Sequence, residues 1–272
     1  MPYTIDTEQH IVDMIRFAKG NGIRFNFQEP KTIQDKLAWL NIYDSNELKV
    51  KCADKIQLHE YCKERIGKDI CVPIIATYKS VDDIKWESLP DSFVIKCNHG
   101  SGMKIIVPDK ADADINLIEH KIRAWMNTNF AFRNGFEAHY NDIPRKILIE
   151  EYKEDGHDSL VDYKFWCFNG EPKFYSIGEQ TNGSSMCYKM NGAKWDLFGS
   201  HNSGDYKKPK NLAEMKRISK ILSEPFKFVR INFYEIDGKM YLGEMTFTPG
   251  ACVLKCQKPE DDLKLGSMLK IE

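Results

Sequence analysis

The spacing of apolar residues divides the chain into a helical beginning and a strand-rich remainder. Apolar side chains recur at helical spacing between residues 11 and 18 and again between residues 33 and 40. A third run of this kind ends at Gly67, and glycine commonly follows the last residue of a helix. The pattern therefore predicts a helical N-terminal region over residues 1–71, in which Asp54 caps the third helix and Lys55 lies in its first turn.

From Val72 onward the pattern changes to short runs of β-branched and aromatic residues. Residues 93–107 contain two such runs separated by a polar segment with two glycines, which predicts a strand, a tight loop and a returning strand. The apolar run at residues 147–152 predicts a buried strand that ends in two carboxylates. Residues 72–152 are therefore expected to form a first lobe of helices and strands.

The remainder of the chain is expected to form a second lobe over residues 153–272. The polar segment at residues 153–158 marks the hinge that precedes it. Two turn dipeptides, Asn169-Gly170 and Asp237-Gly238, each separate a pair of strand-like runs. Such dipeptides favour the tight turns of β-hairpins, so the second lobe is predicted to be built from hairpins.

The composition is that of an ordinary soluble globular protein, because 42% of the 272 residues are hydrophobic and 29% are charged. The formal net charge of −1 provides no basic field that would hold nucleic acid or an anionic membrane. No stretch approaches the roughly 20 apolar residues of a membrane span, and the polar N-terminus lacks the core of a signal peptide. We therefore expect a cytoplasmic protein whose eight cysteines, none in a CxxC pair, are small buried hydrophobes.

The glycine-containing loop is the first candidate for chemistry. A loop with Gly100 and Gly102 can turn its backbone N–H groups inward as an anion site, and Lys96 would add the full positive charge that a polyphosphate requires. Lys55 at the start of a helix opposes the helix dipole unless an anion binds it. The alternatives are a plain hairpin and a solvated surface lysine, and these residues alone leave both open.

The last predicted hairpin is the second candidate. Strand alternation places Arg230 and Asn232 on one face of its first strand, and Leu242, Glu244 and Thr246 on one face of its second. Pairing these faces gathers an arginine, an amide and a carboxylate, and oxygen ligands of this kind suit Mg²⁺. The alternative is an exposed hairpin held by ion pairs.

Six ordered motifs between residues 31 and 252 resemble the ATP-grasp superfamily, and within it the TupA-like ATP-grasp proteins of bacterial surface-polysaccharide gene clusters. The motifs are Asp35-Lys36-Leu37, Ala53-Asp54-Lys55, the segment from Ser88 to Gly102, Ile149-Glu150-Glu151-Tyr152, Asp162-Tyr163-Lys164-Phe165, and the segment from Gly243 to Gly250. The resemblance implies an α+β fold, the ATP-grasp fold, with two α+β lobes around ATP and a helical N-terminal region.

The resemblance also implies roles for individual residues, with ATP and Mg²⁺ as the cofactors. Its nucleotide-binding positions correspond to Lys55 and Lys96 at the phosphates, to His99, Gly100, Ser101 and Gly102 in the loop over them, to Glu150, Glu151 and Tyr152 at the adenine and ribose, and to Asp158 at the ribose. Its catalytic positions near the γ-phosphate correspond to Lys164 and Arg230, and its metal ligands correspond to Glu244, Asn232 and Thr246.

One position departs from the family pattern, which usually has aspartate where this chain has Asn232. The carbonyl oxygen of an asparagine still binds Mg²⁺ but carries no charge, so the metal site is expected to be weakened.

The function that the resemblance implies is ATP-dependent carboxylate–amine ligation in capsule or other surface-polysaccharide synthesis. The reaction would join an amino acid or amine to a uronic-acid carboxylate through an acyl-phosphate. The expected partners are this small-molecule or glycan carboxylate, the amine donor and other enzymes of polysaccharide synthesis, with no nucleic acid. Two alternatives stay open, a kinase of a sugar or glycan hydroxyl and a non-catalytic nucleotide-binding homologue.

Overall fold

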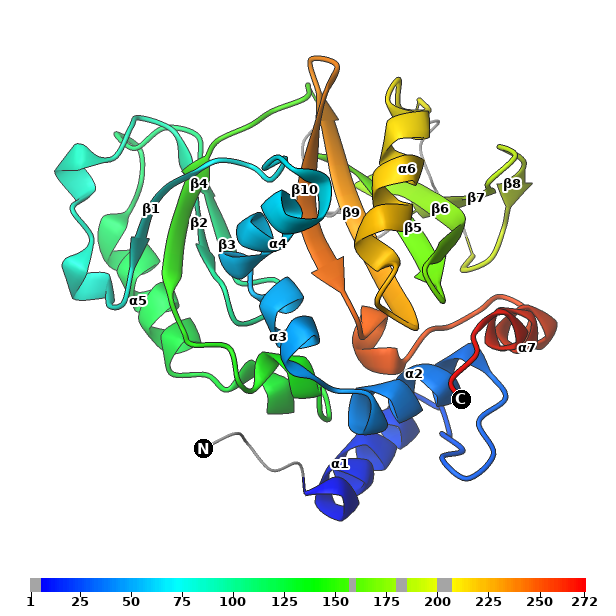
Figure 1. The fold of residues 1–272 in the computed structure, drawn as a ribbon. Coiled ribbons are helices and arrows are strands. Elements are labelled where there is room, and N and C mark those ends of the chain that lie inside the picture. The colour runs from blue at the N-terminus through cyan, green and yellow to red at the C-terminus, as the bar shows by residue number, and fades with distance from the viewer. Residues whose placement is uncertain (1–5, 157–159, 180–184, 200–206) are drawn as a thin grey trace.

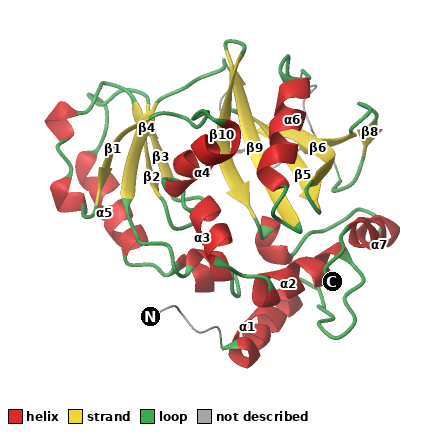
Figure 2. Ribbon diagram, in the orientation of Figure 1, coloured by secondary structure: helices red, strands yellow, loops and turns green. Residues whose placement is uncertain are grey.

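The computed structural model describes residues 6–156, 160–179, 185–199 and 207–272. Two β-sheets stand side by side, and helices of the N-terminal region gather beneath and between them (Figure 1). Figure 2 shows that the strands separate into a smaller and a larger group. The fold is therefore α+β, as expected.

Four helices make up the N-terminal region. They are α1 (Thr7–Gly20), α2 (Ile33–Tyr43), α3 (Glu47–Ala53) and α4 (Gln57–Ile66). Thr32 begins α2 with a reciprocal capping box to Asp35, and Gly67 ends α4 in the left-handed conformation at φ 76°. The predicted helical character of this region is confirmed for the described residues.

The predicted start of the third helical run is wrong. Helix α4 begins at Gln57, so Lys55 precedes the helix and does not lie in its first turn. The Asp54 carboxylate instead accepts hydrogen bonds from the N–H of Ile56 at 2.9 Å and from the Asn98 side chain at 2.9 Å. Asp54 thereby ties the segment that carries Lys55 to the glycine-containing loop.

The smaller sheet contains β1 (Ile74–Tyr78), β2 (Phe93–Cys97), β3 (Lys104–Val107) and β4 (Ile147–Glu151) in the antiparallel order β1-β4-β2-β3. Helix α5 (Ile115–Met126) buries Ile118 and Ile122 beside it. Short 3₁₀ turns at Val81–Asp83, Trp86–Ser88, Phe130–Phe132 and Ala138–Tyr140 connect these elements. The strand, glycine loop and returning strand predicted at residues 93–107 are confirmed as β2 and β3.

The larger sheet has the antiparallel order β10-β9-β5-β6-β7-β8. Its strands are β5 (Val161–Phe168), β6 (Glu171–Glu179), β7 (Ser185–Lys189), β8 (Lys194–Trp195), β9 (Phe228–Ile236) and β10 (Lys239–Thr246). Both predicted hairpins are present, since β5 pairs with β6 and β9 pairs with β10. At their turns Asn169 and Gly170, like Asp237 and Gly238, adopt the positive φ angles that a tight hairpin turn requires. Helix α6 (Leu212–Ser223) packs on this sheet.

The chain ends by returning to the N-terminal region. A 3₁₀ turn at Pro249–Cys252 follows β10, and helix α7 (Pro259–Met268) then packs against α2. The Lys36 ammonium donates hydrogen bonds to the backbone carbonyls of Gly266 and Leu269, at 2.8 and 2.6 Å. Both carbonyls lie at the C-terminal end of α7, so the Lys36 ammonium places a positive charge at the negative end of the helix dipole.

None of the helices in the described parts of the chain is long and apolar enough to cross a membrane. Seven of the eight cysteines are buried, and Cys256 is partly exposed. The expectation that the cysteines behave mainly as small core residues is consistent with this burial.

Candidate functional site

A cavity of about 270 Å³ opens between the two sheets and is lined by both. The smaller sheet and its glycine loop contribute one wall, and strands β5, β9 and β10 contribute the other. Its basic lining residues are Lys55, Lys96, Lys104, Lys164 and Arg230, and its carboxylates are Asp162, Glu179 and Glu244. Since five cations face three carboxylates, the cavity favours an anionic ligand with several charged groups.

Two lysines meet across strands β2 and β3. Lys96 lies directly opposite Lys104 in the antiparallel register, an arrangement that like charges disfavour. Glu150 on β4 offsets part of this repulsion, because its Oε2 atom lies 2.5 Å from the Lys96 ammonium. Although Lys104 is exposed on β3, partial desolvation lowers its pKa, and the charge of Lys96 lowers it further. Sequence reasoning missed Lys104, although its position two residues after Gly102 was a usable signal.

The glycine loop is held by packing as well as by backbone conformation. A side-chain carbon at Gly100 would lie 2.7 Å from the ring of Phe130, and Gly102 adopts φ 72°. The Lys55 ammonium donates a 2.6 Å hydrogen bond to the carbonyl of Gly100, while Ser101 and Gly102 line the cavity. The loop therefore brings Lys55 close to Lys96, as the phosphate-site hypothesis requires.

His99 occupies a different place in this loop. Its side chain is buried, and its Nε2 atom lies 3.1 Å from the carbonyl of Trp125 at the end of α5. The imidazole thus anchors the loop to α5, and His99 is absent from the described residues that line the cavity.

The predicted hinge residues contribute unequally. Glu150 is buried and orients Lys96, as described above. Glu151 forms an ion pair with Lys153 at 2.8 Å, and the Tyr152 hydroxyl donates to Glu154 at 3.3 Å. Those two side chains contact the hinge segment itself. Asp158 lies outside the residues that the structure describes.

The terminal hairpin brings the predicted metal residues together through an irregular register. Glu244 lies opposite Asn232, and Thr246 lies opposite Arg230. A β-bulge between Leu242 and Glu244 shifts the alternation at Gly243. The prediction that Leu242 shares a face with Glu244 is therefore wrong, since Leu242 pairs with Phe233 in the core.

Asn232 is the centre of a group of oxygen atoms. Its side-chain nitrogen donates long hydrogen bonds to Asp162 Oδ1 at 3.4 Å and to Glu244 Oε1 at 3.5 Å. Its buried Oδ1 atom has no hydrogen-bond partner within the described part of the chain. Thr246 Oγ1 donates to Glu244 Oε1 at 3.2 Å. A buried amide oxygen without a partner, beside a carboxylate and a hydroxyl, is a donor set that fits Mg²⁺.

The two carboxylates of this group, Glu244 and Asp162, have pKa values shifted in opposite directions. Burial raises the pKa of Glu244, but the charges of Arg230, Lys55 and Lys164 outweigh burial and hold it below its ordinary value. Burial raises the pKa of Asp162 above its ordinary value despite the Lys164 ammonium 3.0 Å from its Oδ2 atom. Of the two carboxylates, Glu244 is therefore the one that the surrounding charges keep ionised.

Arg230 and Lys164 lie on adjacent strands and face the same cavity. The Arg230 guanidinium donates to Glu244 at 3.3 Å and to Thr246 at 3.1 Å, and it lies over the ring of Trp166. Sequence reasoning assigns no role to Asp162, although it shares a face of β5 with Lys164 two residues later. In the structure Asp162 is buried and lines the cavity.

The family model for TupA-like ATP-grasp proteins matches residues 35–270. No curated protein matches the chain.

Among solved structures, the chain is similar to D-alanine–D-alanine ligase from Helicobacter pylori, with 17% identity, a TM-score of 0.50 and coverage of 87% of this chain and 69% of that one. The ligase from Bacillus anthracis complexed with ATP matches at 16% identity and a TM-score of 0.46, over 83% of this chain and 64% of that one. The chain thus spans less than two thirds of the latter protein. C-terminally truncated Cdc123 from Schizosaccharomyces pombe matches at 10% identity and a TM-score of 0.44, over 76% and 88% of the two chains.

The Helicobacter ligase, at this low identity, supports the fold alone, and it agrees with the α+β fold class. The family match covers most of the sequence, including the glycine loop and the terminal hairpin. The chain belongs to the TupA-like ATP-grasp family.

Proposed function

We propose that the chain is an ATP-dependent carboxylate–amine ligase. The observation that carries this proposal is the convergence of five basic side chains on one cavity that also holds the oxygen group around Glu244; four come from the two sheets and Lys55 comes from the segment before α4. Such a cavity suits a nucleoside triphosphate with Mg²⁺. Family membership and the fold shared with a D-alanine–D-alanine ligase support the same assignment.

In this proposal Lys55 and Lys96 bind the phosphates from the side of the glycine loop. Their positions are supported by the Gly100 carbonyl and the Glu150 carboxylate. The backbone at residues 150–152 would receive the adenine. Glu244, Asn232 and Thr246 would hold Mg²⁺, which when bound neutralises phosphate charge. Lys164 and Arg230 approach from the larger sheet, where charge develops on the γ-phosphoryl group.

The proposed reaction has two steps. A carboxylate oxygen of the acceptor attacks the γ-phosphorus, the bond from phosphorus to the β–γ bridging oxygen breaks, and ADP leaves as an acyl-phosphate forms. The amine nitrogen then attacks the acyl carbon, the carbon–oxygen bond to phosphate breaks, and inorganic phosphate and an amine proton leave. Arg230 and Lys164 stabilise negative charge in both steps because they face the cavity from adjacent strands.

We further propose that the acceptor is a uronic-acid sugar used in surface-polysaccharide synthesis. The resemblance to TupA-like proteins of polysaccharide gene clusters supports this role. The excess of basic over acidic lining residues supports an acceptor that is itself anionic.

An isotope experiment tests the ligase chemistry. The protein is incubated with Mg²⁺, ATP and D-glucuronate labelled with ¹⁸O in its carboxylate, with hydroxylamine as a small amine. Ligation predicts ADP, a hydroxamate, and inorganic phosphate that carries one ¹⁸O atom. Phosphate attached to the sugar would instead identify a kinase, and ATP binding without turnover across a panel of uronic acids and amines would identify a non-catalytic binder.

A further inference from the structure

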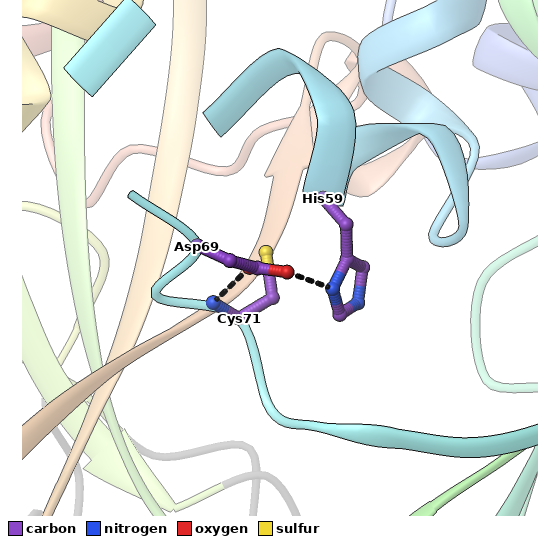
Figure 3. A group of neighbouring side chains, drawn as sticks. All are labelled: His59, Asp69 and Cys71. Atoms are coloured by element: carbon purple, nitrogen blue, oxygen red, sulfur yellow. Dashed lines mark hydrogen bonds and ion pairs between the residues drawn. The ribbon is translucent and has the colours of Figure 1, made fainter. Parts of the chain in front are cut away.

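A second cavity, of about 670 Å³, lies apart from the site described above. It is lined by the segment between α4 and β1, the start of α6 and the turn between β9 and β10. His59, Asp69 and Cys71 all line it, and Figure 3 shows their side chains converging from α4 and from the segment that follows it. None of the three has a part in the proposed ligase chemistry.

These three side chains are held in a defined arrangement. Asp69 accepts a 3.0 Å hydrogen bond from the Cys71 N–H through Oδ1, and its Oδ2 atom lies 2.8 Å from His59 Nδ1 (Figure 3). One imidazole nitrogen, one carboxylate oxygen and the Cys71 sulfur all lie within 4.8 Å of one another. The carboxylate is thus oriented by the backbone of the same segment that supplies the sulfur.

The donor set matches the chemistry of zinc. Zn²⁺ accepts nitrogen, oxygen and sulfur ligands together, whereas Mg²⁺ and Ca²⁺ select oxygen alone. One carboxylate and one thiolate would balance the two positive charges of the ion. We propose that His59, Asp69 and Cys71 form a zinc-type site with three protein ligands and a fourth position open to the 670 Å³ cavity.

Both elements that carry the ligands are anchored. His59 is in α4, which ends at Gly67. The chain turns at this glycine, and the segment that follows brings Asp69 and Cys71 back towards His59. The Ile70 carbonyl accepts a 2.7 Å hydrogen bond from the N–H of Leu242, and Cys71 forms a parallel bridge with Leu242 on β10. An ion at this site would therefore connect α4, through the segment that contains Asp69 and Cys71, to β10, the strand that carries Glu244.

Two neighbours help to define the site. The Cys62 sulfur lies 3.8 Å from the Cys71 sulfur but is fully buried, so it serves as a control thiol. The Lys63 ammonium lies 3.9 Å from Asp69 Oδ2 on an exposed side chain that can turn into solvent. Without a metal, His59 and Asp69 form only a hydrogen-bonded pair, and the experiment must distinguish this outcome from a metal site.

Co²⁺, a spectroscopic substitute for Zn²⁺, provides the test on the full-length protein. We expect one equivalent of Co²⁺ to produce the visible bands of a tetrahedral site and a near-ultraviolet thiolate-to-cobalt band, which Zn²⁺ then removes. Cys71→Ser should abolish the thiolate band, and the matched variant Cys62→Ser should keep it. His59→Gln and Asp69→Asn should each weaken Co²⁺ binding by about tenfold or more, the loss that even supporting residues of metal sites cause.

Three results would overturn the proposal: no thiolate band, a band that survives Cys71→Ser, or a band that Cys62→Ser removes. His59→Gln alters a partly exposed side chain, so it keeps the test valid if Cys71→Ser fails to fold. Glu244→Gln should leave the band unchanged, because the oxygen group around Glu244 offers no sulfur. Failure of the zinc-type site therefore leaves the proposed ligase function untouched, and the reverse also holds.

Discussion

At the scale of single residues, Lys96 is the cation whose removal should matter most for nucleotide binding. Lys96→Met is expected to weaken ATP binding by about 10- to 100-fold, because hydrogen bonds to charged groups contribute about 1.5–3 kcal/mol. The change also leaves Glu150 buried without its cation, so stability should fall. Calorimetric titration with ATP measures the affinity, and the exposed Lys216→Met serves as the control.

The double variant Lys96→Met/Glu150→Gln separates folding from binding. It removes both charges of the pair, so it should regain most of the lost stability without regaining affinity for ATP. Normal ATP affinity in either folded variant would contradict the phosphate-binding role of Lys96.

Asn232 makes a second residue-scale prediction. Asn232→Asp places a third carboxylate within about 3.5 Å of Asp162 and Glu244, so the metal-free protein should lose stability. Mg²⁺ should restore it and bind about tenfold more tightly than in the natural chain, since the ligand gains a charge. Melting temperatures with EDTA and with Mg²⁺ measure both effects. The exposed Asn191→Asp is the control, and equal Mg²⁺ dependence in all three proteins would refute the metal site.

The buried Glu137 gives a prediction for pH. Burial raises its pKa from 4.5 to about 7, although the Thr248 hydroxyl donates a hydrogen bond to its carboxylate. Between these values the unfolded chain ionises while the folded protein keeps the proton, so stability falls as pH rises and the loss is complete above about pH 7. Glu137→Gln should therefore gain up to about 3 kcal/mol relative to the natural protein across this range.

Urea unfolding at about pH 4.5 and about pH 8 measures this difference. The exposed Glu87→Gln should show no comparable trend. If the natural protein and Glu137→Gln respond to pH in parallel, Glu137 does not hold its proton in the folded state.

At the scale of elements, the contact between α7 and α2 joins the two ends of the chain. A side-chain carbon at Gly266 would lie 2.0 Å from the backbone oxygen of Lys31, so α7 can pack there only with glycine. Gly266→Ala is expected to destabilise the protein by about 1–3 kcal/mol or more, because the Lys31 backbone cannot move aside as the end of a flexible side chain can. Gly20→Ala, with nothing within 4 Å, is the matched control in urea unfolding. Equal stability of the two variants would mean that α7 packs differently.

At the scale of the whole molecule, the cavity between the sheets should recognise phosphates more than the nucleoside. ATP at about 100-fold above its Kd is expected to raise the melting temperature by about 5–10 °C. AMP at the same concentration should have little effect, since it lacks the phosphates that Lys96 from one sheet and Arg230 from the other would contact together. Equal stabilisation by AMP and ATP would mean that the β- and γ-phosphates contribute nothing to binding, which would contradict the proposed phosphate contacts in this cavity.

Much of the architecture follows from local rules that the sequence displays. Helical spacing and Gly67 predicted the N-terminal helices, and the two turn dipeptides predicted both hairpins of the larger sheet. The ordered motifs predicted the family, which the match over residues 35–270 confirms. The helices and hairpin turns depend on residues close together in the chain, so periodicity and backbone preference are sufficient to reveal them, whereas the family was predicted from the resemblance of its motifs.

The remaining features depended on contacts between distant segments. The bulge at Gly243 moved Leu242 into the core, because one inserted residue exchanges the two faces of a strand. The pairing of Glu150 with Lys96, the opposition of Lys96 and Lys104, and the burial of His99 against Trp125 likewise join residues from different elements.

The sequence by itself therefore determined the helical character of the N-terminal region and the positions of both hairpin turns, since the residues responsible lie close together in the chain. Only the tertiary structure decided which charged and polar side chains meet. Asp162 and Asn232 are far apart in the chain but adjacent in the structure. His59 and Cys71 lie on opposite sides of the turn that ends α4, and they too are neighbours in the structure. Their proximity comes from sheet register and from the packing of the segment after α4 on β10, which periodicity does not encode.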